Sequence, residues 1–185
     1  PPMRCLSKNL GAGARVGFDS RMHSYSWYEE SRQLLTKQEI ELVEISQNPI
    51  DKHWQDRPEA SQSLALLLSE TFTGESSASK RQRIGEDIGR LDADVALLTQ
   101  LDSIAWLLNI RGADVPRLPV LLSFATLDKD GQVVLYTDPR KLTNDFSSHV
   151  GDGVTIQNFE ELQSALETMG NGGLKVLADP LTANA

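Results

Sequence analysis

The stretch that decides the fold is LDSIAWLLNIRGADVP, residues 101–116. The Asp-Ser pair at 102–103 is of the kind that caps helix N-termini, and it predicts a short helix over 104–109 that ends near Gly112. The residues before it, DVALLT at 94–99, are mostly apolar, as in a strand buried on both faces. A buried strand followed directly by a helix indicates an α/β protein.

The strongest local signal lies downstream of this stretch. The apolar runs 120–126 and 132–137 flank LDKDG at 127–131, in which Asp-Gly supplies the residue at positive φ that a tight hairpin turn requires. Beyond the hairpin, periodicity and breaker residues predict alternating helices and strands. These are helices at 139–146 and 159–169 and strands at 154–157 and 174–178.

The segment upstream of 94 has the same alternation. A helix over 78–91 is predicted to begin at Ser76 or Ser77. The first residues predict a short α/β region with only two strands, too few for an independently stable sheet. Its elements are strands at 15–19 and 40–45 and helices at 23–37 and 48–54.

The pattern divides the chain into three parts. Residues 1–57 form a partial α/β domain, residues 58–75 a linker, and residues 76–185 a second α/β domain. The linker is rich in Ser, Pro and Gly, and we expect its leucines to pack on a neighbouring domain. A short helix at 62–69 is an alternative for part of it.

Composition restricts the possible partners. The chain has 185 residues, with 18 Lys+Arg against 26 Asp+Glu, a formal net charge of −8. An acidic chain is not expected to bind nucleic acid or an anionic membrane surface. Its one cysteine, Cys5, cannot form an internal disulfide, which favours a reducing, cytoplasmic location. No apolar run approaches the roughly 18 residues of a membrane span.

Catalytic and metal-binding motifs do not emerge from the residues. The histidines His23, His53 and His149 are far apart in sequence, and there is no HExxH, GxSxG or P-loop motif. The glycines at 11–13 precede a strand rather than follow one, so they do not match a dinucleotide-binding turn. We therefore predict no catalytic, cofactor-binding or metal-binding residue in this chain.

Residues 101–116 closely resemble the segment LDxIAWLLNLRGxDxP of the three-domain Xaa-Pro aminopeptidases, also called aminopeptidase P. Further segments extend the resemblance over nearly the whole chain, and one of them, 74–81, is similar to bacterial members. The other matched segments are 16–23, 48–58 and 175–184. Ser20 stands where the family usually has Pro, a difference that affects a helix entry rather than chemistry.

The resemblance implies a creatinase/aminopeptidase P N-terminal-like fold, with a mixed sheet flanked by helices, preceded by part of a first creatinase-like domain. In such enzymes a separate pita-bread domain holds two metal ions, expected to be Mn²⁺, and hydrolyses the bond before a penultimate proline. The chain would then be a non-catalytic N-terminal part that shapes the access of proline-containing peptides and supports a homodimer. The competing hypothesis is a free-standing creatinase-like interaction module without peptidase activity.

Trp106 and Arg111 are the residues for which a contact role is predicted. In one interpretation they line the catalytic cleft or a subunit interface, since both residue types are common in interfaces. In the other, Trp106 fills the domain core and Arg111 neutralises the C-terminal end of the helix.

Overall fold

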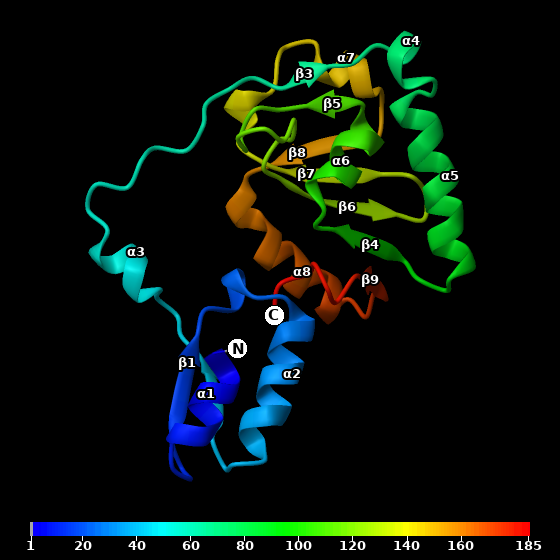
Figure 1. Cartoon of the computed structure of the whole chain (residues 1–185). Helices are drawn as coiled ribbons and strands as arrows, with labels where there is room; N and C mark the ends of the chain where they lie inside the picture. The colour runs from blue at the N-terminus through cyan, green and yellow to red at the C-terminus, as the bar shows by residue number, and fades with distance from the viewer. Residues whose placement is uncertain (1) are drawn as a thin grey trace. The chain divides into compact units, whose positions relative to one another are not determined.

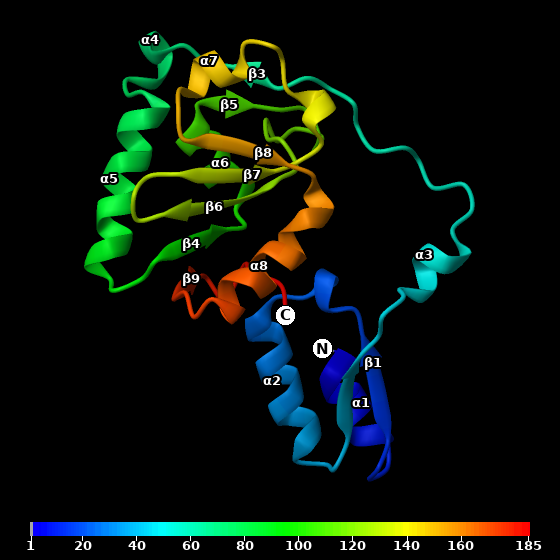
Figure 2. The ribbon, with the colours of Figure 1, turned by 180° about the vertical axis from the view of Figure 1, so that it is seen from behind.

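The computed structural model describes residues 2–185 (Figure 1), and these form two compact units. The first unit comprises residues 2–58 together with Asp179–Ala185, and the second comprises Glu59–Ala178. The sheet of the second unit can be followed from its other side in Figure 2.

The first unit contains a parallel pair of strands, β1 (Arg15–Phe18) and β2 (Glu41–Glu44), joined through η1 (Ser20–Met22) and α2 (Tyr25–Thr36). Two further helices, α1 (Pro2–Asn9) and α3 (Pro49–His53), complete it. The two predicted strands and the helices at 23–37 and 48–54 are confirmed, with shorter bounds. Nothing in the sequence analysis predicted α1.

Side chains fix the ends of these helices. Ser24 caps α2 by accepting the Trp27 N–H, and Asn48 caps α3 by accepting the Ile50 N–H, which is the role its place before Pro49 predicts. The Phe18 ring stacks on Tyr28 of α2, at 5.3 Å between ring centroids.

The second unit is built on a five-stranded mixed sheet in the order β8-β7-β6-β4-β9. β4 pairs antiparallel with β6, and β6 with β7, whereas β7–β8 and β4–β9 are parallel. This confirms the predicted fold class. The strands are β4 (Val95–Leu98), β6 (Phe124–Asp128), β7 (Val133–Tyr136), β8 (Val154–Gln157) and β9 (Val176–Ala178).

Apolar side chains from the sheet and from helices form one core in this unit. Leu127 and Leu135 of the sheet lie in the same buried cluster as Ile88, Ile104 and Phe146 of three helices. The helices and short elements around the sheet are α4 (Glu70–Thr73), α5 (Ser77–Arg90), α6 (Leu101–Leu108), η2 (Pro139–Lys141), α7 (Phe146–Val150), η3 (Phe159–Glu161) and α8 (Leu162–Asn171).

The hairpin turn between β6 and β7 confirms the Asp-Gly prediction. Gly131 has a φ of 80°, and the Asp128 carboxylate accepts the N–H groups of Asp130 and Gln132. The helix predicted from Ser76 is also present as α5. Ser76 is its N-cap, and the Ser76 hydroxyl accepts the Ser79 N–H.

Four predicted elements differ from the structure. The helix predicted over 104–109 from an Asp102-Ser103 cap is α6 (Leu101–Leu108), which begins after Gln100 and has no side-chain cap hydrogen bond. The helix at 139–146 is instead the short turn η2 followed by α7, and the helix alternative at 62–69 is wrong. Part of that segment is β3 (Leu66–Leu67), which pairs antiparallel with β5 (Ile110–Arg111). The strand predicted from 120 begins only at Phe124. The backbone of Leu122 bonds to side chains instead of a neighbouring strand, because its N–H donates to Asp114 and its carbonyl accepts from Thr137.

Two glycines of α5 differ in how closely they approach the hairpin between β6 and β7. A Cβ at Gly85 would lie 2.9 Å from the Lys129 carbonyl oxygen, whereas a Cβ at Gly89 meets nothing closer than 3.8 Å. We expect Gly85→Ala to lower the free energy of unfolding by about 1–3 kcal/mol through overpacking. Gly89→Ala should raise it by about 0.5–1 kcal/mol, since alanine loses less entropy in a helix. Urea unfolding checks both, and equal effects would contradict the close contact.

Candidate functional site

The helix α6 ends at Asn109, which adopts a left-handed conformation with φ 54°. Its side-chain amide joins two other segments: Oδ1 accepts from Lys80 Nζ at 2.6 Å, and Nδ2 donates to the Glu75 carbonyl at 2.8 Å. Its backbone carbonyl accepts from the Leu68 N–H at 2.9 Å and lies 3.0 Å from His149 Nε2. Asn109 therefore fixes the end of α6 to the start of α5, to the strand β3 and to α7.

Lys80 is the buried cation under this helix end. Its side chain is 2% exposed, and Nζ also donates to the Trp106 carbonyl at 2.9 Å. The ammonium lies 4.5 Å from the centroid of the Trp106 ring. Both hydrogen-bond acceptors are neutral, and burial lowers the pKa of Lys80 below its ordinary value.

The Trp106 ring itself lies at the surface. The residue is 42% exposed, so the interpretation that it fills the core is wrong. Arg83, which is one helical turn beyond Lys80, places its guanidinium carbon 5.7 Å from the ring centroid and forms an ion pair with Glu75 at 2.9 Å. A ring with cations at these distances is a cation–π arrangement.

Arg111 follows directly after this helix end. Its Nη1 donates to its neighbour's carbonyl, that of Ile110, at 2.7 Å and to the Ala105 carbonyl at 3.4 Å. Ala105 lies in the last turn of α6, so Arg111 places positive charge at the C-terminal end of the helix, as one of the two interpretations expected.

Sequence analysis missed Lys80, Arg83 and Glu75 as neighbours of Trp106. They lie more than twenty residues upstream, Lys80 and Arg83 in α5 and Glu75 just before it, and the sequence sign of their charge is the basic run KRQR at 80–83. The spacing of Lys80 and Arg83 does place them on one helix face. What the sequence could not provide is the packing that brings that face against α6.

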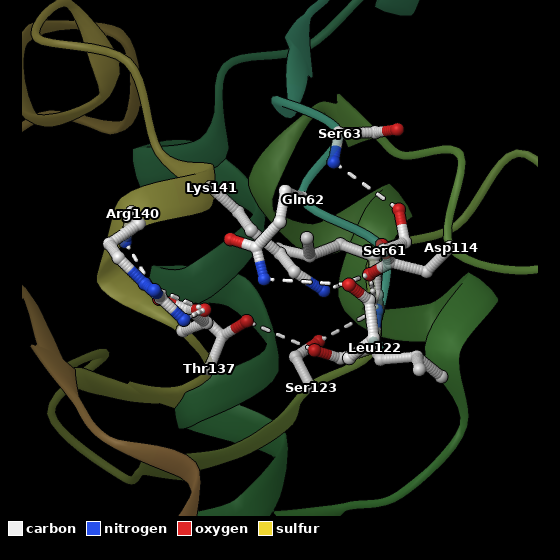
Figure 3. Close-up of polar contacts among 12 residues, drawn as sticks. Ser61, Gln62, Ser63, Asp114, Leu122, Ser123, Thr137, Arg140 and Lys141 are labelled. Carbon is white, nitrogen blue, oxygen red and sulfur yellow. Dashed lines mark hydrogen bonds and ion pairs between the residues drawn. The ribbon is translucent and has the colours of Figure 1, made fainter. Parts of the chain in front are cut away.

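The rest of the 101–116 stretch is held by a buried ion pair (Figure 3). Asp114 Oδ2 lies 3.0 Å from Lys141 Nζ and accepts the Leu122 N–H at 2.7 Å, and both charged side chains are buried. Figure 3 also shows residues 61–63 passing this pair, and further along that segment Ala65 N–H donates to the Lys141 carbonyl.

Gly112 allows the loop to close over this pair. A Cβ there would lie 2.5 Å from the Val120 carbonyl oxygen, closer than any real contact. Both residues therefore stabilise the loop. Gly112 permits the close approach of two backbone segments, and Asp114 binds the Leu122 N–H and the buried Lys141.

Arg81 is a third buried cation, and it bonds only to backbone carbonyls. Its two terminal nitrogens donate to four of them, and its Nε has no partner within residues 2–185. Burial lowers the pKa of Arg81, since no carboxylate is among its partners. The four acceptors are the carbonyls of Gly131, Val150, Asp152 and Gly153.

A metal ion does not fit the residues that the structure describes. Over residues 2–185, no group of three or more His, Cys, Asp or Glu side chains is placed to hold one. The histidines are separate: His23 stacks on Trp27 at 3.6 Å between ring centroids, His53 ends α3, and His149 lies against Asn109. No helix in the described part of the chain has the length and apolar character to cross a membrane.

Comparison with known proteins supplies the family. The profile of the Creatinase/Prolidase N-terminal domain matches residues 56–185. The chain belongs to this family. The matched residues include Asn109, Trp106 and the Asp114–Lys141 pair, so all of these lie within the family's N-terminal domain.

Individual relatives extend the match over nearly the whole chain. Xaa-Pro aminopeptidase 1 of Dictyostelium discoideum is 31% identical over 97% of this chain, and Xaa-Pro aminopeptidase ApepP of Drosophila melanogaster is 33% identical over 78%. The chain spans 30% and 24% of these two proteins. Both are eukaryotic, so the likeness of 74–81 to bacterial members stays a prediction.

A solved structure has the same fold. X-prolyl aminopeptidase from Caenorhabditis elegans, described as a cytosolic enzyme with a di-nuclear active site, superimposes with a TM-score of 0.86 and 24% identity. The match covers 96% of this chain and 30% of that protein.

The buried ion pair gives a direct test of the loop. We expect Asp114→Asn to lower the free energy of unfolding by about 3–5 kcal/mol, because it leaves the charge of Lys141 buried without a partner. Asp92→Asn is the matched control, since Asp92 forms an exposed ion pair with Lys175, and it should leave stability nearly unchanged. Urea unfolding followed by circular dichroism compares them, and a small effect of Asp114→Asn would contradict the assignment.

Proposed function

We propose that this chain acts as the non-catalytic N-terminal region of an Xaa-Pro aminopeptidase. The observation that carries the proposal is the match of 97% of the chain, at 31% identity, to 30% of Xaa-Pro aminopeptidase 1. In family terms, residues 1–57 are the end of a first creatinase-like domain, 58–75 a linker and 76–185 most of a second domain. The family profile spans 56–185 and so includes both the proposed linker and the proposed second domain.

In the whole enzyme the chemistry belongs to a separate catalytic domain with two divalent metal ions, which we expect to be Mn²⁺. The di-nuclear site named for the Caenorhabditis elegans protein supports this expectation. We propose that this chain contributes contacts rather than a reaction step. Its proposed roles are to limit access of proline-containing peptides to the cleft and to support a homodimer, in the cytoplasm.

Trp106 and Arg111 are the residues that we propose for this contact. Trp106 presents an exposed ring over the buried ammonium of Lys80, and Arg111 donates to the Ala105 carbonyl in the last turn of the same helix. A large exposed aromatic side chain next to an arginine is the composition of an interface centre. The free-standing interaction module remains the competing function, and the two differ in whether a metal-binding catalytic domain follows in the same polypeptide.

Kinetics of the full-length enzyme test the proposal. Trp106→Ala should lower kcat/KM for an Xaa-Pro peptide by roughly fivefold or more, the usual cost of truncating an interface tryptophan. The metal content should not change, because no metal ligand is touched. The exposed Leu91 at the end of α5 provides the control, and Leu91→Ala should leave kcat/KM as it is.

Two results would reject the proposal. One is an unchanged kcat/KM in Trp106→Ala together with a lowered melting temperature, which would make the residue merely structural. The other is a coding sequence for the whole protein that lacks the five metal ligands expected of the catalytic domain, which would favour the free-standing module.

A further inference from the structure

The surface around Trp106 carries an excess of positive charge. Lys80 and Arg83 lie near the Trp106 ring, Arg111 lies at the end of the same helix, and the charges of both arginines act on the Lys80 ammonium. Two carboxylates act on these cations: Glu75, which forms an ion pair with Arg83 and also acts on Lys80, and Asp87, which acts on Arg83. The chain as a whole is acidic, with a net charge of −8.

Neutral oxygens account for the remaining contacts of these cations. Lys80 Nζ donates to the Trp106 carbonyl and the Asn109 side chain, and Arg111 Nη1 donates to two backbone carbonyls. Hydrogen bonds to neutral oxygens satisfy the donors without cancelling the charge. The positive field of the cluster therefore extends to the exposed face of Trp106, where a ligand would meet it.

We propose that the Trp106 surface, formed by Trp106, Arg83 and Arg111 over Lys80, binds an acidic peptide segment of a partner protein. An apolar side chain of that segment lies on the exposed indole ring, and its carboxylates pair with the guanidinium groups of Arg83 and Arg111. The proposal rests on the proposed contact role of this surface and specifies the chemistry of what it contacts.

The charge distribution favours a carboxylate-bearing peptide over a nucleic acid. A polyphosphate follows an extended basic surface, whereas this cluster is confined to the start of α5 and the end of α6. Guanidinium groups match carboxylates in planar, two-point contacts, and an indole ring adds apolar area between them. A short segment with an apolar residue between acidic residues fits both features.

The binding is tested on the 185-residue chain itself. The probe is acetyl-Asp-Glu-Leu-Glu-Asp-amide, and the readout is the indole N–H signal of Trp106 in an NMR titration, assigned with Trp106→Phe. We expect this signal to shift on titration and the binding to weaken as salt is added. Arg83→Gln and Arg111→Gln should each weaken binding roughly two- to fivefold, as expected for partly exposed ion pairs.

Two controls isolate the surface. Arg90→Gln removes another exposed, ion-paired arginine of α5, and it should leave the affinity unchanged. The neutral peptide acetyl-Asn-Gln-Leu-Gln-Asn-amide should not shift the Trp106 signal.

The proposal is overturned by any of three results: equal binding of the neutral peptide, equal weakening by Arg90→Gln, or tighter binding of a short single-stranded DNA than of the acidic peptide. Because the titration needs no peptidase activity, its failure leaves the kinetic test of the proposed function standing.

Discussion

The second unit depends on the hydrogen bonds of one residue, Asn109. Its side-chain amide binds the start of α5, and its backbone carbonyl accepts from Leu68, the residue after β3, and lies against His149 of α7. Three segments that are distant in sequence therefore meet at this residue. The left-handed backbone turns the chain out of α6, and the amide then holds Lys80 beneath Trp106. The Lys80 ammonium donates to the Trp106 carbonyl and so fixes the last turn of α6. The exposed position of the indole ring follows from this hydrogen bond.

Three buried cations in this unit are stabilised in different ways, and their functions divide accordingly. Lys141 pairs with the buried carboxylate of Asp114, which cancels its charge and holds a loop. The terminal nitrogens of Arg81 donate to four backbone carbonyls that lie between β6 and β8 in the sequence, and this role is structural. Lys80 donates to two neutral oxygens and lies against the ring of the exposed Trp106, so no carboxylate bonds to its buried ammonium.

Most of the fold could be predicted because it is determined locally. Periodicity, caps and the Asp-Gly turn identified the strands and the long helices, and the segment 101–116 identified the family. Contacts between residues distant in sequence could not be predicted from the pattern. Examples are the pairing of Leu66–Leu67 with Ile110–Arg111 and the hydrogen bond from the Leu122 N–H to Asp114, which makes β6 begin later than predicted. The same limit applies to the site, where Trp106 and Arg111 were identified and the partners from α5 were not.

The central claim is that the Asn109 side chain, and not only its backbone conformation, holds the start of α5 against the end of α6. The most direct measurement is the free energy of unfolding of Asn109→Gly, which keeps the left-handed backbone and removes the amide. We predict a loss of about 2–4 kcal/mol, because a buried charged donor and a carbonyl lose their partner. Arg117→Gly, at another left-handed and exposed position, should be close to neutral. An equally small effect of Asn109→Gly would contradict the account.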